Sequence, residues 1–247
     1  MPRSLLKTRT SAQGAGLGRS SFGDKSKKRV FIVDDHPILL KGLTQMINGE
    51  ADLVVAGQAE EAHQALEDLS KSKFDIAIVD LSLKDGNGLD LVKILKSRLP
   101  KLPVLVLSAH DEGLYAVRAL RAGARGYIMK REATEKLLGA VRQIIHGEIS
   151  VSEDLKLKML EKVADGHAES AGSPIEQLSN RELEVFQLIG QGFNTRQIAE
   201  KLCVSFKTVD AYRTHIKEKL NLENTARLVH HAIQWAQESH KFSPNRG

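Results

Sequence analysis

Residues 74–89 constrain the fold of this chain more than any other stretch. An apolar run, residues 74–79, is followed at once by the carboxylate of Asp80, and turn-forming residues follow at 84–88. An apolar run that ends on an acid is typical of a buried strand in a parallel sheet. Because reactive side chains in open parallel sheets lie at the carboxyl ends of the strands, this pattern predicts that Asp80 lies at the functional edge.

Three other apolar runs also end on polar side chains. In chain order these side chains are Asp34 with Asp35, Ser108, and Lys130. In a parallel sheet they would gather around Asp80. Three carboxylates at one edge repel one another and are tolerated only with a bound cation and a counter-charge nearby. A hard divalent ion such as Mg²⁺ fits, because it takes oxygen ligands and keeps water molecules that phosphate oxygens can replace.

Strands and helices are predicted to alternate between residues 30 and 147. The strands lie near 29–34, 53–57, 74–80, 103–108 and 125–129, and the helices near 36–48, 59–71, 87–98, 112–122 and 132–146. Such alternation implies a parallel sheet with helices on both faces. Five strands of this kind fit the flavodoxin-like order of a doubly wound α/β fold.

Residues 30–147 resemble the receiver domain of two-component response regulators, on the strand-end positions just described and on their order. In that family the central aspartate accepts a phosphoryl group from a sensor histidine kinase, and the resemblance assigns this role to Asp80. It also implies that Asp34, Asp35, Asp80 and the backbone carbonyl of Ser82 hold Mg²⁺. His36, next to the acid pair, is interpreted as a helix-start residue, since Mg²⁺ prefers oxygen.

The resemblance implies three further roles in the same site. Ser108 would hydrogen-bond the phosphoryl group, Lys130 would neutralise it, and Tyr127 would reorient on activation. Two positions depart from the commonest family pattern. Lys84 stands where proline is frequent, and Arg131 follows Lys130 where many receivers have proline; cis bonds before other residues are rare.

The chain of 247 residues is long enough for two domains. We predict a disordered basic leader at 1–28, the receiver at 29–147, a linker at 148–175 and a DNA-binding domain at 176–241. Residues 1–29 carry eight Lys and Arg against one Asp, whereas the whole chain has a net charge of +5. A disordered leader is favoured by this composition, and a weak grip on DNA phosphates is the alternative. In the linker, residues 153–164 can form a helix and residues 165–177 are expected to be flexible.

The second domain has an all-helical pattern with four helices. Helix caps are predicted at Ser179, Asn194, Ser205 and Asn224, the first two in capping-box spacing. A short helix, a tight break and a longer helix make a helix-turn-helix. Residues 178–192, 194–202 and 205–221 resemble the DNA-binding domain of LuxR-type (NarL/FixJ) response regulators. The final helix is expected to run from Asn224 to Trp235.

The longer helix of this motif is predicted to be the recognition helix. Val209, Ile216 and Leu220 form an apolar stripe that packs on the domain, and small or basic side chains point the other way. We expect base contacts from Asp210, Ala211 and Thr214. Phosphate contacts are expected from Asn194, Thr195, Lys207, Thr208, Tyr212, Arg213 and Lys217. One such helix covers one half-site, so we expect a homodimer on double-stranded DNA.

Cysteine content and hydropathy limit the cellular compartments in which the protein is expected. The single cysteine, Cys203, excludes a disulfide framework and a cysteine-based zinc site, and it is expected to be buried in the turn. A reducing cytosol is the natural setting. No apolar run approaches the roughly 20 residues needed to span a bilayer. A cytoplasmic protein without membrane partners is predicted.

Two alternatives from other functional classes remain open. The first is a phosphatase or phosphotransferase with Asp80 as nucleophile; haloacid-dehalogenase-type enzymes place a second aspartate two residues later, where this chain has Ser82. The second is a ligand-sensing regulator, which would not need the strand-end acids, hydroxyl and lysine together. The favoured hypothesis is a non-enzymatic transcriptional response regulator.

Overall fold

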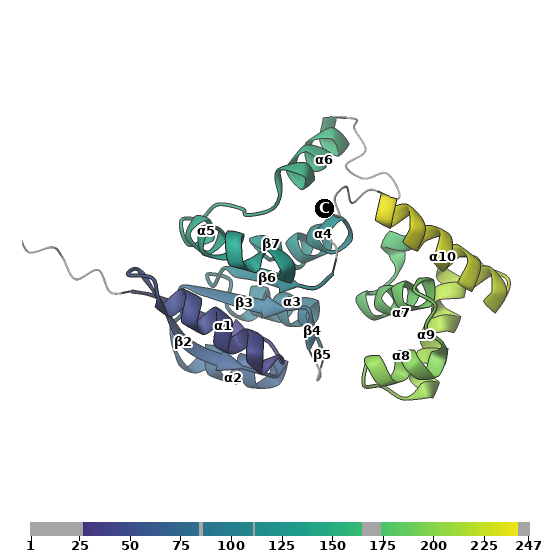
Figure 1. Cartoon of the computed structure of the whole chain (residues 1–247), viewed down its shortest axis with the longest axis horizontal. Coiled ribbons are helices and arrows are strands. Elements are labelled where there is room, and N and C mark those ends of the chain that lie inside the picture. Colours follow the sequence, from purple (N-terminus) through teal and green to yellow (C-terminus); the bar gives the residue numbers. More distant parts are fainter. Residues whose placement is uncertain (1–26, 84–85, 111, 165–173, 242–247) are drawn as a thin grey trace, which may run out of the picture.

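The computed structural model describes residues 27–83, 86–110, 112–164 and 174–241, which form two lobes (Figure 1). Most of the predicted basic leader and the part of the predicted flexible linker at 165–173 lie outside the described residues. No helix in the described part of the chain is both long and apolar enough to cross a membrane. No cis peptide bond occurs in that part either, so the peptide bond between Lys130 and Arg131 is trans.

The larger lobe is built on a parallel five-stranded sheet. Its strands are β1 (Lys28–Val33), β2 (Leu53–Ala59), β3 (Ile76–Asp80), β6 (Val104–Ser108) and β7 (Gly126–Met129). Their order is β2-β1-β3-β6-β7, and every pairing is parallel. The predicted flavodoxin-like doubly wound sheet is therefore confirmed. A small hairpin, β4 (Ser82–Leu83) with β5 (Gly86–Asn87), forms the loop after β3.

Helices cover both faces of this sheet because successive strand residues point to opposite sides. One face packs against α1 (Pro37–Asn48) and α5 (Ala133–Ile145), and the other against α2 (Ala62–Lys71), α3 (Gly88–Arg98) and α4 (Glu112–Ala122). In β3, Ile76 and Ile78 face the first pair, whereas Ala77 and Val79 face the other three. A short 3₁₀ turn, η1 (Lys130–Glu132), joins β7 to α5.

The smaller lobe is helical, as predicted. After a 3₁₀ turn, η2 (Pro174–Gln177), it contains α7 (Asn180–Gly190), α8 (Thr195–Lys201), α9 (Phe206–Lys219) and α10 (Thr225–Lys241). The side chains of Ser179, Asn194, Ser205 and Asn224 all accept backbone hydrogen bonds at helix starts, which confirms the four predicted caps. The last helix extends beyond its predicted end at Trp235.

One sequence-based expectation about the turn between α8 and α9 was wrong. Cys203 is exposed, and its backbone has a positive φ of 52°. The turn needs this left-handed conformation to reverse the chain, and the conformation directs the short side chain outward. The apolar neighbours on either side, Leu202 and Val204, pack against the core instead.

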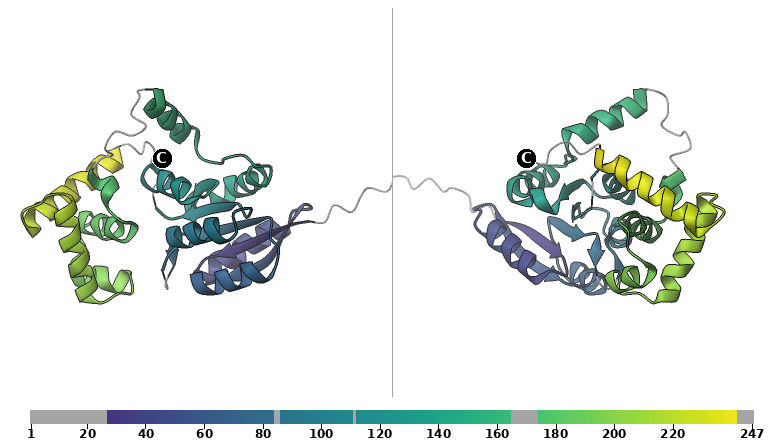
Figure 2. Two further views of the ribbon diagram at one scale, coloured as in Figure 1. Left: turned by 180° about the vertical axis from the view of Figure 1, so that it is seen from behind. Right: turned by 45° about the vertical axis from the view of Figure 1, so that its right-hand side comes forward.

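In sequence, α6 (Glu153–Ala164) lies between the two lobes, and it projects outward from the larger lobe (Figures 1 and 2). It confirms the helix predicted at 153–164. Its approach is anchored at the sheet edge, where the backbone N–H of Tyr127 donates to the carbonyl of Ser150 at 2.9 Å. Leu155 is buried, whereas Leu157 and Leu160 are exposed.

The crossing of α7 and α10 depends on a glycine. A Cβ atom at Gly190 would collide with the carbonyl oxygen of Ala232 and lie 3.1 Å from the Cβ of Ala236. By contrast, a Cβ at Gly139, within α5, would meet no atom within 4 Å. These two helical glycines therefore make a matched pair.

We expect Gly190→Ala to destabilise the smaller lobe by about 1–3 kcal/mol, because the helices must move apart. Gly139→Ala should instead stabilise the larger lobe by about 0.4–1 kcal/mol, through lower entropy of the unfolded chain. Urea unfolding followed by circular dichroism measures both. An unchanged unfolding free energy in Gly190→Ala would contradict the close helix contact.

Candidate functional site

Strand register brings the four predicted strand-end positions together. Val33 pairs with Val79, which places Asp34 opposite Asp80. Asp80 itself pairs with Leu107, the residue before Ser108. Ser108 in turn pairs with Met129, the residue before Lys130. Because neighbouring strands are separated by only about 4.8 Å, each polar group lies one strand from the next.

The acids of this site are buried, and two of them share one cation. The exposed fractions are 1% for Asp34, 6% for Asp35 and 1% for Asp80. The Lys130 ammonium lies 2.7 Å from Oδ2 of Asp34 and 2.8 Å from Oδ2 of Asp80. Burial raises the pKa of Asp80, although Lys130 opposes it. Burial also disfavours the charged form of Lys130, but the carboxylates of Asp80 and Asp34 outweigh it and raise the lysine pKa.

The atoms of this cluster suit a hard divalent cation. Ligand atoms of Asp34, Asp35, His36 and Asp80 all lie within 4.8 Å of one another. Oδ1 of Asp80 is buried and makes no hydrogen bond. A buried carboxylate oxygen without a partner is costly unless a ligand satisfies it. Receiver domains typically bind Mg²⁺ at such an acidic pocket, and the oxygen-rich donor set fits that ion.

His36 lies beside the acids and belongs to the start of α1. Its Nδ1 is 2.7 Å from Asp35 Oδ1 and 3.0 Å from Asp34 Oδ1, and its side chain is 62% exposed. It occupies the N-cap position without making a side-chain cap bond. The ring therefore lies at the outer rim of the acidic cluster.

The loop after β3 returns closely against the end of that strand. A Cβ at Gly88 would collide with the carbonyl oxygen of Asp80, and the N–H of Gly88 donates to the carbonyl of Leu81 at 2.9 Å. Only glycine permits this approach. The turn thereby brings Gly88, the first residue of α3, directly against the backbone of Asp80 and Leu81.

Ser108 and Tyr127 are both buried and both bonded to the backbone of His110. Ser108 Oγ accepts from the His110 N–H at 3.1 Å, and the Tyr127 hydroxyl donates to the His110 carbonyl at 2.8 Å. Tyr127 is only 2% exposed. The inward position of this aromatic ring is therefore available to the unmodified chain.

Sequence reasoning missed the central position of His110. Its ring Nε2 lies 3.0 Å from Ser82 Oγ, and the ring stacks on Tyr115 with centroids 4.4 Å apart. Burial, together with the nearby Lys130 charge, lowers the pKa of His110 to about 4. No local pattern identifies such a residue, because its partners lie on different strands and helices.

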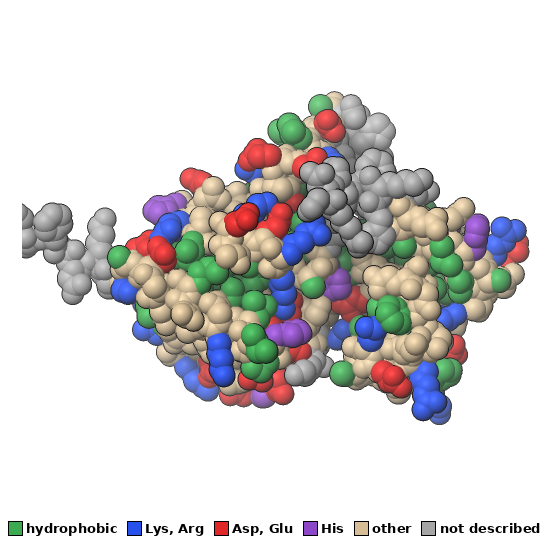
Figure 3. Space-filling model, viewed as in Figure 1, with side chains coloured by type: hydrophobic (Ala, Val, Ile, Leu, Met, Phe, Trp, Pro, Cys, Tyr) green, Lys and Arg blue, Asp and Glu red, His purple; other side chains and the backbone are tan. Residues whose placement is uncertain are grey.

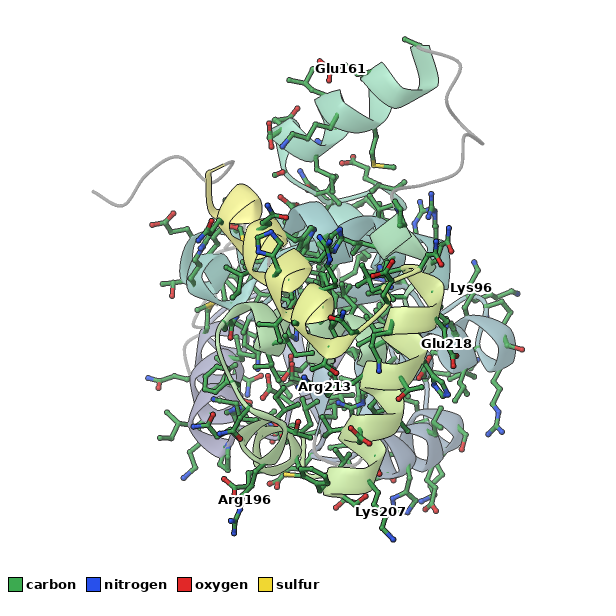
Figure 4. The ribbon with its side chains drawn as sticks, turned by 90° about the vertical axis from the view of Figure 1, so that its right-hand side faces the viewer. Lys96, Glu161, Arg196, Lys207, Arg213 and Glu218 are labelled. Atoms are coloured by element: carbon green, nitrogen blue, oxygen red, sulfur yellow. The ribbon has the colours of Figure 1, made fainter. Side chains whose placement is uncertain are left out.

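The smaller lobe presents α9 on its outer side (Figure 4). The predicted base-contacting residues Asp210, Ala211 and Thr214 are all exposed, as is Lys207. The buried side of the helix carries Val209 and Ile216, as the apolar stripe predicted.

The other predicted DNA contacts differ in their surroundings. Arg213 is partly buried and donates to Thr195 Oγ1 at 3.2 Å, and Thr208 Oγ1 lies 2.7 Å from Ser205 Oγ. Asn194 uses its side-chain oxygen in the α8 cap. Lys217 is partly buried. Arg196, which the sequence analysis did not single out, projects from α8 at the same edge as Lys207 (Figure 4).

Tyr212 faces the larger lobe in this structure. It lines a cavity of about 440 Å³ together with residues of α3 and α4, including Asp90, Lys93 and Arg121. Its predicted phosphate contact would therefore require this side of α9 to become accessible.

The two lobes touch through α7, which the sequence did not indicate. The Tyr115 hydroxyl donates to Gln187 Oε1 at 2.9 Å, and Asn87 Nδ2 donates to Glu184 Oε1 at 3.2 Å. Glu184 is 4% exposed, and burial raises its pKa although Arg181 opposes the shift. Such long-range pairs leave no periodic signal in the sequence.

Comparisons with known proteins agree with this geometry. Residues 30–142 match the family described as response regulator receiver domain, and residues 176–232 match the bacterial regulatory proteins of the luxR family. The chain is 36% identical over 210 residues to the oxygen regulatory protein NreC of Staphylococcus haemolyticus, covering 83% of this chain and 97% of the relative. NreC of Staphylococcus carnosus is 33% identical with the same coverage.

Solved structures of similar proteins include the RcsB response regulator of Salmonella typhimurium. One RcsB structure has a TM-score of 0.58 at 27% identity and covers 84% of this chain and 98% of RcsB. An RcsB–DNA complex has a TM-score of 0.55 at 28% identity, and the match covers 83% of this chain and 97% of RcsB.

The low pKa of His110 gives a testable pH dependence. Below its ordinary pKa of 6.5 the unfolded chain binds a proton that the folded chain resists until about pH 4. Stability should therefore fall as pH falls through this window. Between about pH 7.5 and pH 5, we expect the unfolding free energy of the larger lobe to fall by about 2 kcal/mol more in the wild type than in the His110→Gln variant. Urea unfolding at both pH values measures this difference, and an imidazole pKa of 6 or above by NMR would contradict it.

Proposed function

Because the chain belongs to the response regulators that join a receiver domain to a LuxR-type DNA-binding domain, we propose that Asp80 is its phosphorylation site. The observation that carries this proposal is the unpartnered oxygen Oδ1 of Asp80, buried among the other acids and beside Lys130. A sensor histidine kinase is the proposed phosphoryl donor. DNA binding is the proposed output.

The site residues divide the chemistry among them. Asp80 Oδ1 is the proposed nucleophile toward phosphorus, and Asp34, Asp35, Asp80 and the Ser82 carbonyl are the proposed Mg²⁺ ligands. Bound Mg²⁺ would neutralise charge on the phosphoryl oxygens. Lys130, already held by two carboxylates, is proposed to pair with a phosphoryl oxygen once Asp80 is phosphorylated.

Ser108 and Tyr127 are the proposed reporters of phosphorylation. The Ser108 hydroxyl is buried one strand from Asp80 and is proposed to hydrogen-bond the phosphoryl group. Any movement of Ser108 acts on the His110 backbone, which also binds the Tyr127 hydroxyl. The aromatic ring is therefore linked to the phosphorylation site through a single residue.

DNA binding is proposed to use α8 and α9, with α9 in the major groove. Asp210, Ala211 and Thr214 are the proposed base contacts, supported by their exposure on one side of α9. Solved relatives include two RcsB dimers bound to two parallel DNAs, and RcsB bound to a promoter in the presence of the phosphomimetic BeF₃⁻. A homodimer on inverted half-sites is proposed for this chain.

We propose a regulator in the cytoplasm, where promoters are accessible, and no enzymatic turnover. Ser82 supports this assignment, because a phosphatase of the haloacid-dehalogenase type would carry an acid at that position. The hydroxyl of Ser82 is instead engaged with the His110 ring. The strand-end set also favours a receiver over a ligand-sensing domain.

The first test concerns Asp80 itself. With acetyl phosphate and Mg²⁺, we expect the chain to be labelled, Asp80→Ala to be unlabelled, and Asp35→Ala to be labelled at least ten-fold more slowly. Asp90→Ala is the matched control, since Asp90 is an exposed acid on α3 that should leave labelling unchanged. Phos-tag gels measure the rates. Full labelling of Asp80→Ala would disprove the assignment.

The second test concerns sequence readout by α9. Asp210 is an acceptor suited to cytosine N4, so Asp210→Ala should relax one base preference by about 1–3 kcal/mol. Lys207→Ala should weaken binding to all DNA sequences alike, and it should lower the slope of log affinity against log salt concentration by about one. Binding-site selection and salt titrations measure these effects, with exposed Glu218→Ala as control. An unchanged preference in Asp210→Ala would place this residue outside the readout.

A further inference from the structure

The acidic site opens into a cavity whose walls come from both lobes. The cavity has a volume of about 440 Å³. Its receiver wall includes Asp35, Ser82 and His110, and its opposite wall includes Glu184, Gln187 and Lys201 of the DNA-binding domain. Figure 3 shows the hollow between the lobes, with acidic and histidine side chains at its edge. The DNA-binding domain therefore covers the side of the acidic site on which Asp35 and Ser82 lie.

Specific hydrogen bonds hold the DNA-binding domain in this position. Besides the Tyr115–Gln187 and Asn87–Glu184 pairs, Arg118 of α4 donates to the carbonyl of Leu178 at 2.7 Å and to that of Ile175 at 2.9 Å. These donors come from the receiver, and their acceptors belong to α7 and the segment that leads into it. We call this set of contacts the docking contacts.

The docking contacts are polar but largely removed from water. Tyr115 is fully buried, and the apolar cluster on this side of the sheet continues from Leu89 into Leu178 and Leu183. Inter-domain interfaces of this kind resemble transient protein interfaces, so relative domain motion is expected. An undocked state of the same chain is therefore expected beside the docked one.

The size of the cavity separates two classes of phosphoryl donor. A volume of about 440 Å³ falls within the range of about 300–1,000 Å³ that is typical of small-molecule pockets. Acetyl phosphate fits such a space. A phosphohistidine on a protein does not, because the surface around that histidine must approach the receiver where α7 already lies.

We propose that the docked DNA-binding domain is a gate that admits small phosphodonors to Asp80 and excludes protein donors until it undocks. The proposal rests on Asp80 being the phosphoryl acceptor. In both reactions a bond forms between phosphorus and Asp80 Oδ1. With a protein donor the P–N bond of phosphohistidine breaks, and the imidazole keeps the electron pair and takes up a proton. With acetyl phosphate a P–O bond breaks and acetate leaves.

The test compares two donors on one undocked variant. Arg118→Ala with Gln187→Ala removes docking contacts from both lobes and leaves every proposed site residue intact. Arg227→Ala with Gln234→Ala is the matched control, because both side chains are exposed on α10 of the DNA-binding domain. Small-angle X-ray scattering gives the undocked fraction of each chain. The protein donor is an autophosphorylated histidine kinase core, selected for labelling the undocked variant.

The expected result is a donor-specific change. Acetyl phosphate should label the wild type, the control and the undocked variant at rates within about two-fold. The kinase should label the undocked variant at least five-fold faster than the other two. A wild-type chain that is nine-tenths docked should be about ten-fold slower than an open one, since only the competent fraction reacts.

Three outcomes count against the proposal or its premise. Equal kinase rates on an undocked variant and on a docked wild type would overturn the gate. An equal acceleration with acetyl phosphate would also overturn it, because docking would then alter the chemistry of Asp80 and not access to it. If neither donor labels any chain at Asp80, the proposed function itself fails, and this result is distinct from the other two.

Discussion

The ion pairs from Lys130 to Asp34 and Asp80 are the interaction on which the site depends. Three buried carboxylates around one ammonium leave a net negative charge, and burying unpaired charge is strongly unfavourable. The sheet imposes this arrangement, because its register places these polar groups on the ends of neighbouring strands. Each group can reach solvent only at that edge of the sheet. The proposed binding of a divalent cation and the proposed phosphorylation of Asp80 would both relieve this unfavourable charge balance.

The fold and the acidic cluster were predictable because their signals are local. Each strand is a short apolar run, and each strand-end side chain follows its run directly, so topology alone brings Asp80 and Ser108 together. Helix starts were equally predictable, since the side chain of a cap such as Ser179 forms its hydrogen bond within the first turn of its own helix. In these cases the partners lie a few residues apart or are joined by the regular geometry of a parallel sheet.

Other features were not predictable, for physical reasons. The pairing of Tyr115 with Gln187 spans 72 positions and two domains, and neither residue breaks a pattern. The role of His110 depends on stacking and on burial, which sequence spacing does not encode. Cys203 was misplaced because an apolar side chain in a turn was expected to point inward, whereas the positive φ directs it out. A periodic sequence pattern carries no information about long-range packing or about turn conformation.

A continuous path of contacts connects the proposed phosphorylation site to the proposed gate. Ser108 accepts from the His110 backbone, the His110 ring stacks on Tyr115, and the Tyr115 hydroxyl binds Gln187 in the DNA-binding domain. The cavity wall from the DNA-binding domain carries Lys201 and the ion pair of Arg181 with Glu184 at 2.8 Å. Added negative charge at Asp80 would therefore not repel this wall, and undocking has to depend on the hydrogen-bond geometry along this path. Since coupling free energies are reciprocal, whatever phosphorylation does to docking, docking must do to the stability of the phosphorylated state.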